Sequence, residues 1–364
     1  MIEAWREAVV ESAALYVGWG GLLIGAVFGF LVQKTNFCTM GSISDMLVFG
    51  NKNRFRAWLL AGATAIVGVG VVEGAGIANM AQSMYLTPNL NWLANVVGGL
   101  LFGIGMVLSG GCISRNLVRA GGGDLGAVVV LVIAGIFAFA TIGGLIGPLR
   151  VAIFDPTAVD LAASGMKTQR LGDVLARATG LSAQTAVLTT VVVIAGALLL
   201  YCFLNASFRS SPRDIVAGFG IGLCIVAGWV LTGLASDEFA DVRVQLVSLT
   251  YVRPAGDTID YLMRYTALGP PSFAVTTTLG AILGGFLGAA TSRRLSLTGF
   301  ADASDSLRNM IGAALMGIGG VLALGCTVGQ AMTGFSTLAV GSIITFAAIV
   351  AGGVAGIKGM ERFS

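Results

Sequence analysis

The sequence predicts an all-α polytopic membrane protein, and three observations support that fold class. Of the 364 residues, 56% are hydrophobic and only 11% are charged, whereas a soluble domain carries about 25% charged residues. The mean hydropathy is +0.89, and the apolar residues form long runs separated by short polar breaks, as in helices that cross a bilayer. One glycine-rich segment of the first half recurs in the second half. We therefore expect a single membrane domain over residues 1–364.

Nine runs of roughly 20 residues are apolar and nearly free of charge, which is the length that a helix needs to cross the hydrocarbon core. The predicted spans are residues 15–33, 55–80, 93–112, 125–149, 185–205, 215–234, 271–291, 310–326 and 339–358. Two apolar pieces, residues 37–49 and 328–338, are too short to cross and adjoin glycine-rich breaks. We expect half-helices or re-entrant segments there, because free backbone groups at membrane depth are tolerated only against protein or water.

The charges predict an orientation. With the spans above, 13 Lys and Arg residues fall on the side of the C-terminus and 8 on the opposite side, so the positive-inside rule places the N-terminus outside and the C-terminus in the cytoplasm. Residues 1–12 carry three glutamates and only Arg6, which predicts a short polar helix rather than a signal peptide. Glu73 lies inside a predicted span, either as a functional carboxylate or as part of an interface or helix contact.

An internal repeat relates the two halves of the chain. Residues 98–112 align without a gap on residues 312–326, at an offset of 214, and nine of the fifteen positions are identical. Four predicted spans precede the fifth and four follow it, so the fifth span inverts the second half relative to the first. We expect a first repeat at residues 12–150, a linking loop and central span at 150–214 and a second repeat at 215–364. In transporters built this way the substrate site lies between the halves near the midplane.

The five cysteines fall into two groups. Cys38, Cys112 and Cys326 each lie where an apolar run ends in small residues that break a helix. Cys202 and Cys224 lie inside ordinary apolar runs, where a free cysteine behaves as a small buried hydrophobic residue. The first group therefore carries the candidate chemistry.

Composition excludes several function classes. Histidine is absent, which removes the commonest general base and the commonest zinc or copper ligand. The net charge of +3 comes without a cluster of Lys and Arg that would track a nucleic acid.

A soft metal at the three thiols is disfavoured because no closely spaced cysteine pair occurs. Disulfide exchange requires Cα atoms within about 7 Å. A soft, polarizable sulfur-bearing anion fits three neutral thiols best, since a thiol is only a weak donor and acceptor.

An anion also requires positive potential. No interior of a predicted span carries Lys or Arg, so we expect the field to come from unpaired amides at the starts of broken helices. The breaks at 38–42, 110–112 and 325–326 provide such starts. Cationic residues near them either attract the anion at the cytoplasmic mouth or simply anchor the protein by the positive-inside rule: Lys34, Arg115 and Arg119. Polar residues expected to line the path are Thr39, Ser114, Asn116, Thr327 and Gln330.

The motifs around these cysteines resemble those of a known family. They are F-C-T-M-G-S-I-S-D-M at 37–46, G-x-G-x-V-L-S-G-G-C followed by R-A-G-G-G at 103–123, and L-R-N-M-I-G-A-A-L-M-G-I-G-G-V-L-A-L-G-C-T-V-G at 307–329, with V-R-P-A-G-D at 252–257. Over residues 25–358 the chain resembles the YeeE/YedE family of bacterial inner-membrane sulfur-compound transporters, whose characterised substrate is thiosulfate. The resemblance implies two inverted halves with paired half-helices that pinch an hourglass pathway.

The resemblance also implies roles for single residues. In the family, three cysteines pass thiosulfate along through S–H···S contacts, and by motif these fall on Cys38, Cys112 and Cys326. The sequence departs from its own repeat at Leu324, where the first copy has Gly110. Members differ in substrate, and some are assigned to selenium compounds. The sulfur-compound class is therefore a firmer implication than thiosulfate itself.

Three functions remain as hypotheses. The first is uptake of thiosulfate or a related sulfur anion through the inner membrane, without enzymatic activity, metal or cofactor, and with a small cytoplasmic sulfurtransferase as a candidate partner. The second is a membrane thiol-disulfide oxidoreductase, and the third is a soft-metal permease. The expected substrate-binding residues are Cys38, Cys112, Cys326, Thr39, Gly111, Gly325, Thr327 and Gln330.

Overall fold

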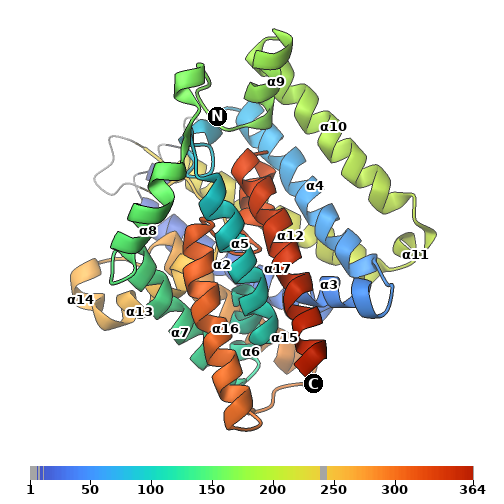
Figure 1. Cartoon of the computed structure of the whole chain (residues 1–364), viewed down its shortest axis with the longest axis vertical. Coiled ribbons are helices and arrows are strands. Elements are labelled where there is room, and N and C mark those ends of the chain that lie inside the picture. Colours follow the sequence, from blue (N-terminus) through green and yellow to red (C-terminus); the bar gives the residue numbers. More distant parts are fainter. Residues whose placement is uncertain (1–5, 7–8, 11, 238–243, 364) are drawn as a thin grey trace.

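The computed structural model describes residues 6, 9–10, 12–237 and 244–363 of the chain. Long helices lie side by side through the molecule, with short helices and loops between them (Figure 1). The helices of the first half are α2 (Ala13–Thr35), α3 (Thr39–Val48), α4 (Asn53–Gly74), α5 (Trp92–Leu108), α6 (Ile113–Gly121), α7 (Leu125–Ile142) and α8 (Gly147–Phe154). A two-residue strand, β1 (Asn89–Leu90), pairs antiparallel with β2 (Val159–Asp160).

The second half is organised in a similar way. Its helices are α9 (Leu171–Thr179), α10 (Ala183–Phe203), α11 (Ala206–Arg209), α12 (Pro212–Ala235), α13 (Val252–Met263), α14 (Tyr265–Leu268), α15 (Phe273–Thr291), α16 (Ala303–Leu322) and α17 (Val340–Phe363). Short 3-10 turns are η1 (Met80–Gln82), η2 (Asp155–Thr157) and η3 (Ala162–Ser164), and a single π-helical turn, η4 (Gly329–Gly334), precedes α17. The all-α fold class predicted from composition is confirmed.

Eight helical segments in the described part of the chain are long and apolar enough to cross a membrane. They match eight of the nine predicted spans, with α2 and α3 joined in one segment and α5 and α6 in another. The ninth predicted span, residues 310–326, corresponds to α16, whose 20 residues include Asp305, Arg308 and Asn309 in its first two turns. With these polar turns, α16 is not among the eight segments. The predicted helix at residues 1–12 lies largely outside the described residues.

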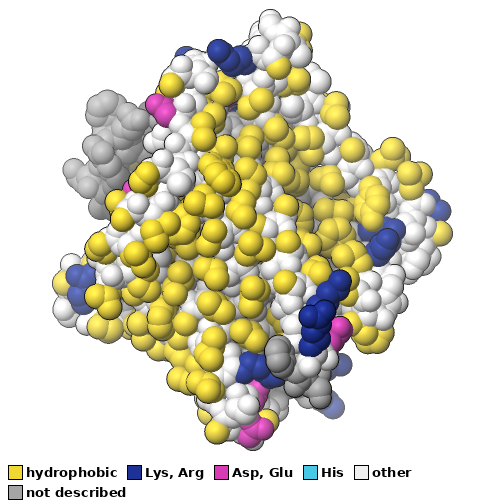
Figure 2. Space-filling view, in the orientation of Figure 1, with side chains coloured by type: hydrophobic (Ala, Val, Ile, Leu, Met, Phe, Trp, Pro, Cys, Tyr) yellow, Lys and Arg dark blue, Asp and Glu magenta, His cyan; other side chains and the backbone are white. Residues whose placement is uncertain are grey.

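The surface is consistent with a protein surrounded by lipid. Figure 2 shows hydrophobic side chains over the broad middle of one face, while Lys, Arg, Asp and Glu side chains lie toward its margins. Large apolar side chains that point outward include Trp19, Leu188 and Val192, each more than 60% exposed. In water such a surface would be unfavourable, whereas in a bilayer it faces hydrocarbon chains. The chain is a multi-pass membrane protein.

Small residues bring α5 and α16 into direct backbone contact. A Cβ atom built on Gly98 would lie 2.7 Å from the Gly319 carbonyl oxygen, and one on Gly105 would lie 2.6 Å from that of Gly312. Only a hydrogen atom fits at these positions, and such small-residue contacts are the usual basis of close helix packing in membranes. With the offset of 214, Gly98 is equivalent to Gly312 and Gly105 to Gly319. Each glycine therefore meets the counterpart of the other, as a two-fold axis between antiparallel helices requires.

Other helix contacts show the same reciprocity. α2 packs on α15 while α12 packs on α4, and α5 packs on α17 while α16 packs on α7. The helix α10, which was predicted as the central span, is central in the sequence but lies at the edge of the molecule in Figure 1. Its contacts are with α4, α9 and α11. The contacts thus relate α2–α7 to α12–α17 and leave α10 outside this arrangement.

Candidate functional site

Cys38, Cys112 and Cys326 occupy the same place in local structure, at the last residue before a short helical segment. Cys38 precedes α3 and Cys112 precedes α6, in both cases as the extended N-cap residue, and Cys326 precedes the turn that leads into η4. The carbonyl of each cysteine accepts the backbone N–H four residues later, at 2.9, 3.0 and 2.8 Å respectively. The helix breaks that were predicted from small residues are present. Of the two predicted half-helices, residues 37–49 form α3 and residues 328–338 form η4, while α6 was missed.

A left-handed residue lies two positions before each of the three cysteines, and before Cys38 it is Asn36, with φ +54°. Gly110 has φ +64° and its repeat counterpart Leu324 has φ +59°, so the departure from the motif leaves the backbone unchanged. A left-handed residue ends the preceding helix and turns the chain toward Gly111 or Gly325 and then the cysteine. Leucine in this region carries a steric penalty of about 1–2 kcal/mol because of its Cβ. The fold keeps this turn even where the sequence has replaced glycine.

Backbone amides of the short segments point toward two of the sulfur atoms. The N–H of Gly41 donates to Cys38 Sγ at 3.5 Å, and the N–H of Gly329 donates to Cys326 Sγ at 3.3 Å. These amides are among those that lack intrahelical partners at a helix start. A helix start carries a partial positive charge, so each sulfur lies where an anion is electrostatically favoured.

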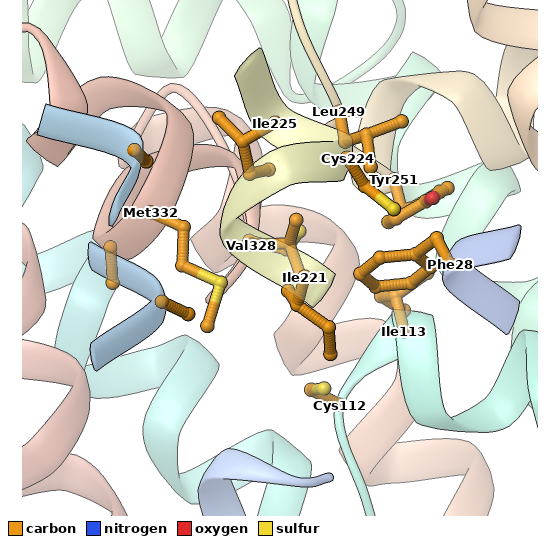
Figure 3. Packing of buried hydrophobic residues seen from close by; sticks show 14 of the residues in the cluster. Phe28, Cys112, Ile113, Ile221, Cys224, Ile225, Leu249, Tyr251, Val328 and Met332 are labelled. Carbon is orange, nitrogen blue, oxygen red and sulfur yellow. The ribbon is translucent and has the colours of Figure 1, made fainter. Parts of the chain in front are cut away.

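Cys112 is an electrostatic neighbour of both other thiols. Its sulfur is 3.2 Å from Ser114 Oγ, and it interacts electrostatically with both Cys38 and Cys326. All three side chains are buried and all three thiols are free. Figure 3 shows Cys112 at the margin of a buried apolar cluster that includes Val328. Cys112 is thus the thiol that has both of the others as electrostatic neighbours.

The other two cysteines serve packing. Cys202 is buried on α10 and its thiol donates to the Arg56 carbonyl at 3.3 Å. Cys224 is part of the apolar cluster, where it lies beside Tyr251 (Figure 3). Neither lies at a helix start, because both fall within continuous helices.

Two arginines flank Cys38. The Arg54 guanidinium lies against Gly41, pairs with Asp45 at 2.9 Å and donates to the Asn36 carbonyl at 2.6 Å. Arg115 donates to Asn36 Oδ1 at 3.2 Å. Both cations interact electrostatically with Cys38. One Nη of Arg115 is buried without a hydrogen-bond partner among the described residues, which leaves a donor beside the thiols.

The remaining predicted cations have their own contacts. Arg119 forms an ion pair with Asp124 at 2.7 Å, and Lys34 donates to Ser292 Oγ at 2.9 Å. Lys34 also lines a polar cavity of about 390 Å³ at the same end of the molecule as Asn36. The lining residues are Gln33, Lys34, Asn36, Arg213, Ser292 and Arg294. This cavity adds three cationic side chains to the end of the structure that carries Cys38.

The two predicted amide residues hold the breaks in shape. Asn116 donates from Nδ2 to the carbonyls of Gly111 and Cys112, at 3.0 and 3.2 Å. Gln330, its repeat counterpart, donates from Nε2 to the Ala323 carbonyl at 2.6 Å. Both side chains thus satisfy carbonyl groups that the helix break leaves free. The hydrogen bonds of these amides thus go to the backbone at the two breaks.

The two predicted threonines each follow a cysteine directly. Thr39 is the buried first residue of α3, directly after Cys38. Thr327 follows Cys326 and is fully buried, and its hydroxyl has no hydrogen-bond partner among the described residues. Thr327 is the predicted lining residue with an unused polar group next to a thiol.

Glu73 lies in the last turn of α4 and forms an ion pair with Arg170 at 2.7 Å. The backbone at Arg170 forms an antiparallel bridge with Ala339, at the start of α17. The carboxylate therefore fastens the linking segment to the first half, while the backbone bridge joins the same segment to the second half, which is the helix-contact alternative for this residue.

Two tyrosines near Cys326 were missed by sequence reasoning. Tyr85 and Tyr251 are buried and interact electrostatically with this thiol. Tyr85 lies in an irregular stretch without a motif, so the sequence provides no signal for it. Tyr251 is 214 residues after Phe37. Extending the repeat register beyond the glycine-rich segment would have placed it beside the second site.

Known proteins resemble the chain over most of its length. A profile of the family described as Sulphur transport matches residues 34–355. The thiosulfate transporter TsuA of Escherichia coli is 26% identical over 332 residues, which cover 86% of each chain. TsuA of Spirochaeta thermophila is 26% identical over 337 residues, 89% of this chain and 93% of that protein.

A shorter similarity extends to a third relative. The probable transporter YedE of Escherichia coli is 31% identical over 99 residues, 27% of this chain and 23% of that protein. The family profile, by contrast, covers most of the chain and includes all three cysteine motifs. The chain belongs to the Sulphur transport family, the YeeE/YedE family that its motifs resemble.

Proposed function

We propose that the protein takes up thiosulfate, or a closely related sulfur-containing anion, across the bacterial inner membrane. The observation that carries this proposal is the row of three buried free thiols, each at the start of a short helical segment, with Cys112 interacting with both Cys38 and Cys326. Two relatives that align over most of the chain are named thiosulfate transporters.

The chemistry of the row suits a substrate with a soft terminal sulfur. A neutral thiol is a weak donor and a weak acceptor, so it stabilises a polarizable sulfur without holding it tightly. The amides of Gly41 and Gly329 contribute positive potential without a full charge. An anion moves from Cys326 to Cys112 to Cys38 through sites of similar, modest affinity. Thr39, Gly111, Gly325 and Thr327 line these steps, while Gln330 keeps the second break in shape.

The charges of the molecule favour one direction. Arg54, Arg115 and the basic cavity lie at the Cys38 end, which the positive-inside rule assigns to the cytoplasm. The N-terminus is then outside and the C-terminus inside. A small acidic sulfurtransferase would find a complementary basic surface at this end. We place release of the anion there and capture at the Cys326 end.

The reciprocal contacts support an inverted repeat as the frame of the pathway. We propose residues 12–150 and 215–364 as the two halves and residues 150–214 as the link between them. The exchange of partners between Gly98 and Gly319 and between Gly105 and Gly312 supports this division. Two short segments from opposite halves then meet from opposite sides of the membrane, with the thiols at their starts.

Two other functions are distinguishable by experiment. An oxidoreductase would cycle its thiols through a disulfide and move electrons rather than solute, and a soft-metal permease would gather ligands around an ion. In the described part of the chain, no three Cys, Asp or Glu side chains are grouped at metal-binding spacing. The function proposed here involves no covalent chemistry, so the protein would act as a transporter and not as an enzyme.

Uptake of radiolabelled thiosulfate into proteoliposomes that contain the purified protein tests the proposal. We expect label to accumulate inside, and we expect pretreatment with a thiol-blocking maleimide to stop it. Electron transfer to an external disulfide without accumulation of label would favour the oxidoreductase. Uptake of Cu(I) in preference to thiosulfate would favour the permease. Empty liposomes and liposomes with the maleimide-treated protein are the matched controls.

A further inference from the structure

Three buried hydroxyl groups without hydrogen-bond partners lie near Cys326. Among the described residues, nothing pairs with the hydroxyl oxygens of Tyr85, Tyr251 or Thr327. Their side chains are at most 2% exposed. Buried polar groups in proteins are almost always paired, so three unpaired hydroxyls around one thiol require an explanation.

Tyr251 is fixed beside the sulfur by its backbone. It is the residue before α13, and its backbone N–H approaches Cys326 Sγ together with that of Val328. Its ring packs on Phe28 with centroids 5.3 Å apart, and Figure 3 shows its side chain between Cys224 and Phe28. The ring is therefore held in place by packing, while its hydroxyl has no partner of its own.

Tyr85 reaches the same region from the loop between α4 and α5. Its ring meets Trp229 edge to face with centroids 6.4 Å apart, and it interacts electrostatically with Cys326. The hydroxyl lies within reach of the Thr250 side chain. Thr250 in turn lies against Gly329, the residue whose amide donates to the Cys326 sulfur. Both tyrosines thus surround one thiol from different parts of the chain.

The two ends of the thiol row offer different partners to an anion. Cys38 has Arg54 and Arg115 as electrostatic neighbours, whereas Cys326 has the two tyrosines. A neutral hydroxyl donates a hydrogen bond to an oxyanion but adds no net charge, so it binds the anion without the strong attraction of a guanidinium. A site of this kind suits capture followed by onward movement.

We propose that Tyr85, Tyr251 and Thr327 form the oxygen-binding part of a substrate site at Cys326. The three hydroxyls donate hydrogen bonds to the oxygen atoms of a sulfur oxyanion, while the Cys326 thiol and the surrounding amides contact its terminal sulfur. The inference rests on the proposed uptake function and deepens it, because it names the groups that recognise the oxygen atoms. Tyr85 and Tyr251 thereby become specificity-determining residues at the outer end of the pathway.

The test removes single hydroxyls from the full-length protein. Tyr85→Phe, Tyr251→Phe and Thr327→Val are compared with wild type for thiosulfate uptake into proteoliposomes. Thermal unfolding in detergent is measured with and without thiosulfate. Tyr261→Phe is the matched control, because the Tyr261 hydroxyl is exposed and donates to the Gly269 carbonyl away from the thiols. Thr327→Ser retains the hydroxyl and should lose less uptake than Thr327→Val if the hydroxyl is what matters.

We expect each loss of a hydroxyl to raise KM about tenfold, which corresponds to one lost contact, with a smaller change in maximal rate. The unliganded variants should be as stable as wild type or more so, since an unpaired buried hydroxyl is removed, and thiosulfate should raise their melting temperature less. Normal uptake by wild type with unchanged KM in all three variants would overturn this inference alone. Lower stability with unchanged KM would also overturn it, by assigning the hydroxyls to the fold. A wild-type protein that neither binds nor takes up thiosulfate would overturn the proposed function and this site with it.

Discussion

The breaks at Cys112 and Cys326 have the same backbone and opposite surroundings. In both, a left-handed residue ends a long helix, a glycine follows, and the cysteine precedes a short helical segment. In the repeat register, however, Arg115 of the first break corresponds to Gly329 of the second. Cys38, which is the second thiol at the first break, corresponds to Val252. The repeat thus preserves geometry while the substituted positions change the chemistry.

Because of this difference, two breaks with similar backbones have different side chains around their thiols. One end combines two thiols with two arginines, and the other combines one thiol with unpaired hydroxyls. The asymmetry cannot drive net uptake by itself, because a binding site lowers the free energy of the anion equally from either direction. Under the proposed function, it would set the order in which the anion meets its partners: hydroxyls first, then thiols, then cations. The following experiments test that order.

The largest effect should come from the thiols that the two breaks share. Replacing Cys112 or Cys326 with Ala removes a contact to a charged substrate worth about 1.5–3 kcal/mol, which corresponds to a loss of uptake of about 10- to 100-fold. Cys38→Ala should have a similar effect. Radiolabelled uptake is the measurement, with Cys202→Ala and Cys224→Ala as controls that should retain activity. Equal losses at all five cysteines would indicate a packing role and contradict the thiol row.

Substitution of a cationic residue near Cys38 should reduce uptake less than substitution of a thiol. Arg115→Gln removes a charge next to Cys38 but keeps a donor that reaches Asn36, the present partner of the guanidinium. A partly exposed charge interaction worth about 1 kcal/mol predicts a loss of about fivefold in uptake. The difference from wild type should shrink in 1 M salt, because screening then acts over about 3 Å.

Arg308→Gln provides the control for charge removal, since Arg308 pairs with Asp305 at the exposed start of α16. This variant should match wild type at every salt concentration. A salt-independent loss for Arg115→Gln would assign Arg115 to the structure around Asn36 and not to attraction of the anion.

The sequence predicted the fold better than it predicted the surroundings of the thiols. Hydropathy located the long helices because lipid contact requires long apolar runs. It missed α6 because Arg115, Asn116 and Arg119 make this short helix polar. It also gave no information on the position of α10, since an apolar helix can face lipid on most of its surface and still lie at the edge of a protein.

Side-chain partners were the least predictable part of the site. The cysteines and the left-handed turn follow from local sequence and from the repeat. Tyr85 reaches Cys326 only through tertiary folding of the loop between α4 and α5, and no local pattern marks it. Asn116 and Gln330 were predicted to line the path, but in the structure their side-chain amides donate hydrogen bonds to backbone carbonyls. Proximity to a cysteine motif therefore located these two residues but did not predict which groups their side chains bind.

Competition by sulfate separates the hydroxyl end from the thiols. Hydroxyls and amides alone would bind both tetrahedral dianions alike. At the thiols, sulfate would exchange strong hydration for weak S–H donors, at a cost of about 1–3 kcal/mol for each poorly satisfied group, and one such group gives about tenfold discrimination. We expect a tenfold excess of sulfate to leave most thiosulfate uptake intact.

The Cys326→Ser variant sharpens this measurement. It places a fourth hydroxyl beside Tyr85, Tyr251 and Thr327, so sulfate should compete more strongly in the variant than in wild type. Full inhibition of the wild-type protein by equimolar sulfate would show that the thiols do not select the substrate. The protein would then be a general oxyanion carrier with incidental cysteines.

The smallest effect concerns the turn before each cysteine. Gly110 and Leu324 share a left-handed φ, which costs leucine about 1–2 kcal/mol, whereas glycine loses about 0.5–1 kcal/mol through the greater freedom of its unfolded chain. Leu324→Gly should therefore raise the free energy of unfolding by at most about 1.5 kcal/mol. Gly110→Leu should lower the free energy of unfolding, and by more than Leu324→Gly raises it. A Cβ at residue 110 would lie 3.2 Å from Arg119 Nη1 and disturb the ion pair of Arg119 with Asp124. The free energy of unfolding in detergent is measured for both variants. Equal and opposite changes would mean that only the backbone turn differs between the two breaks. The charged residues around the first break would then make no contribution.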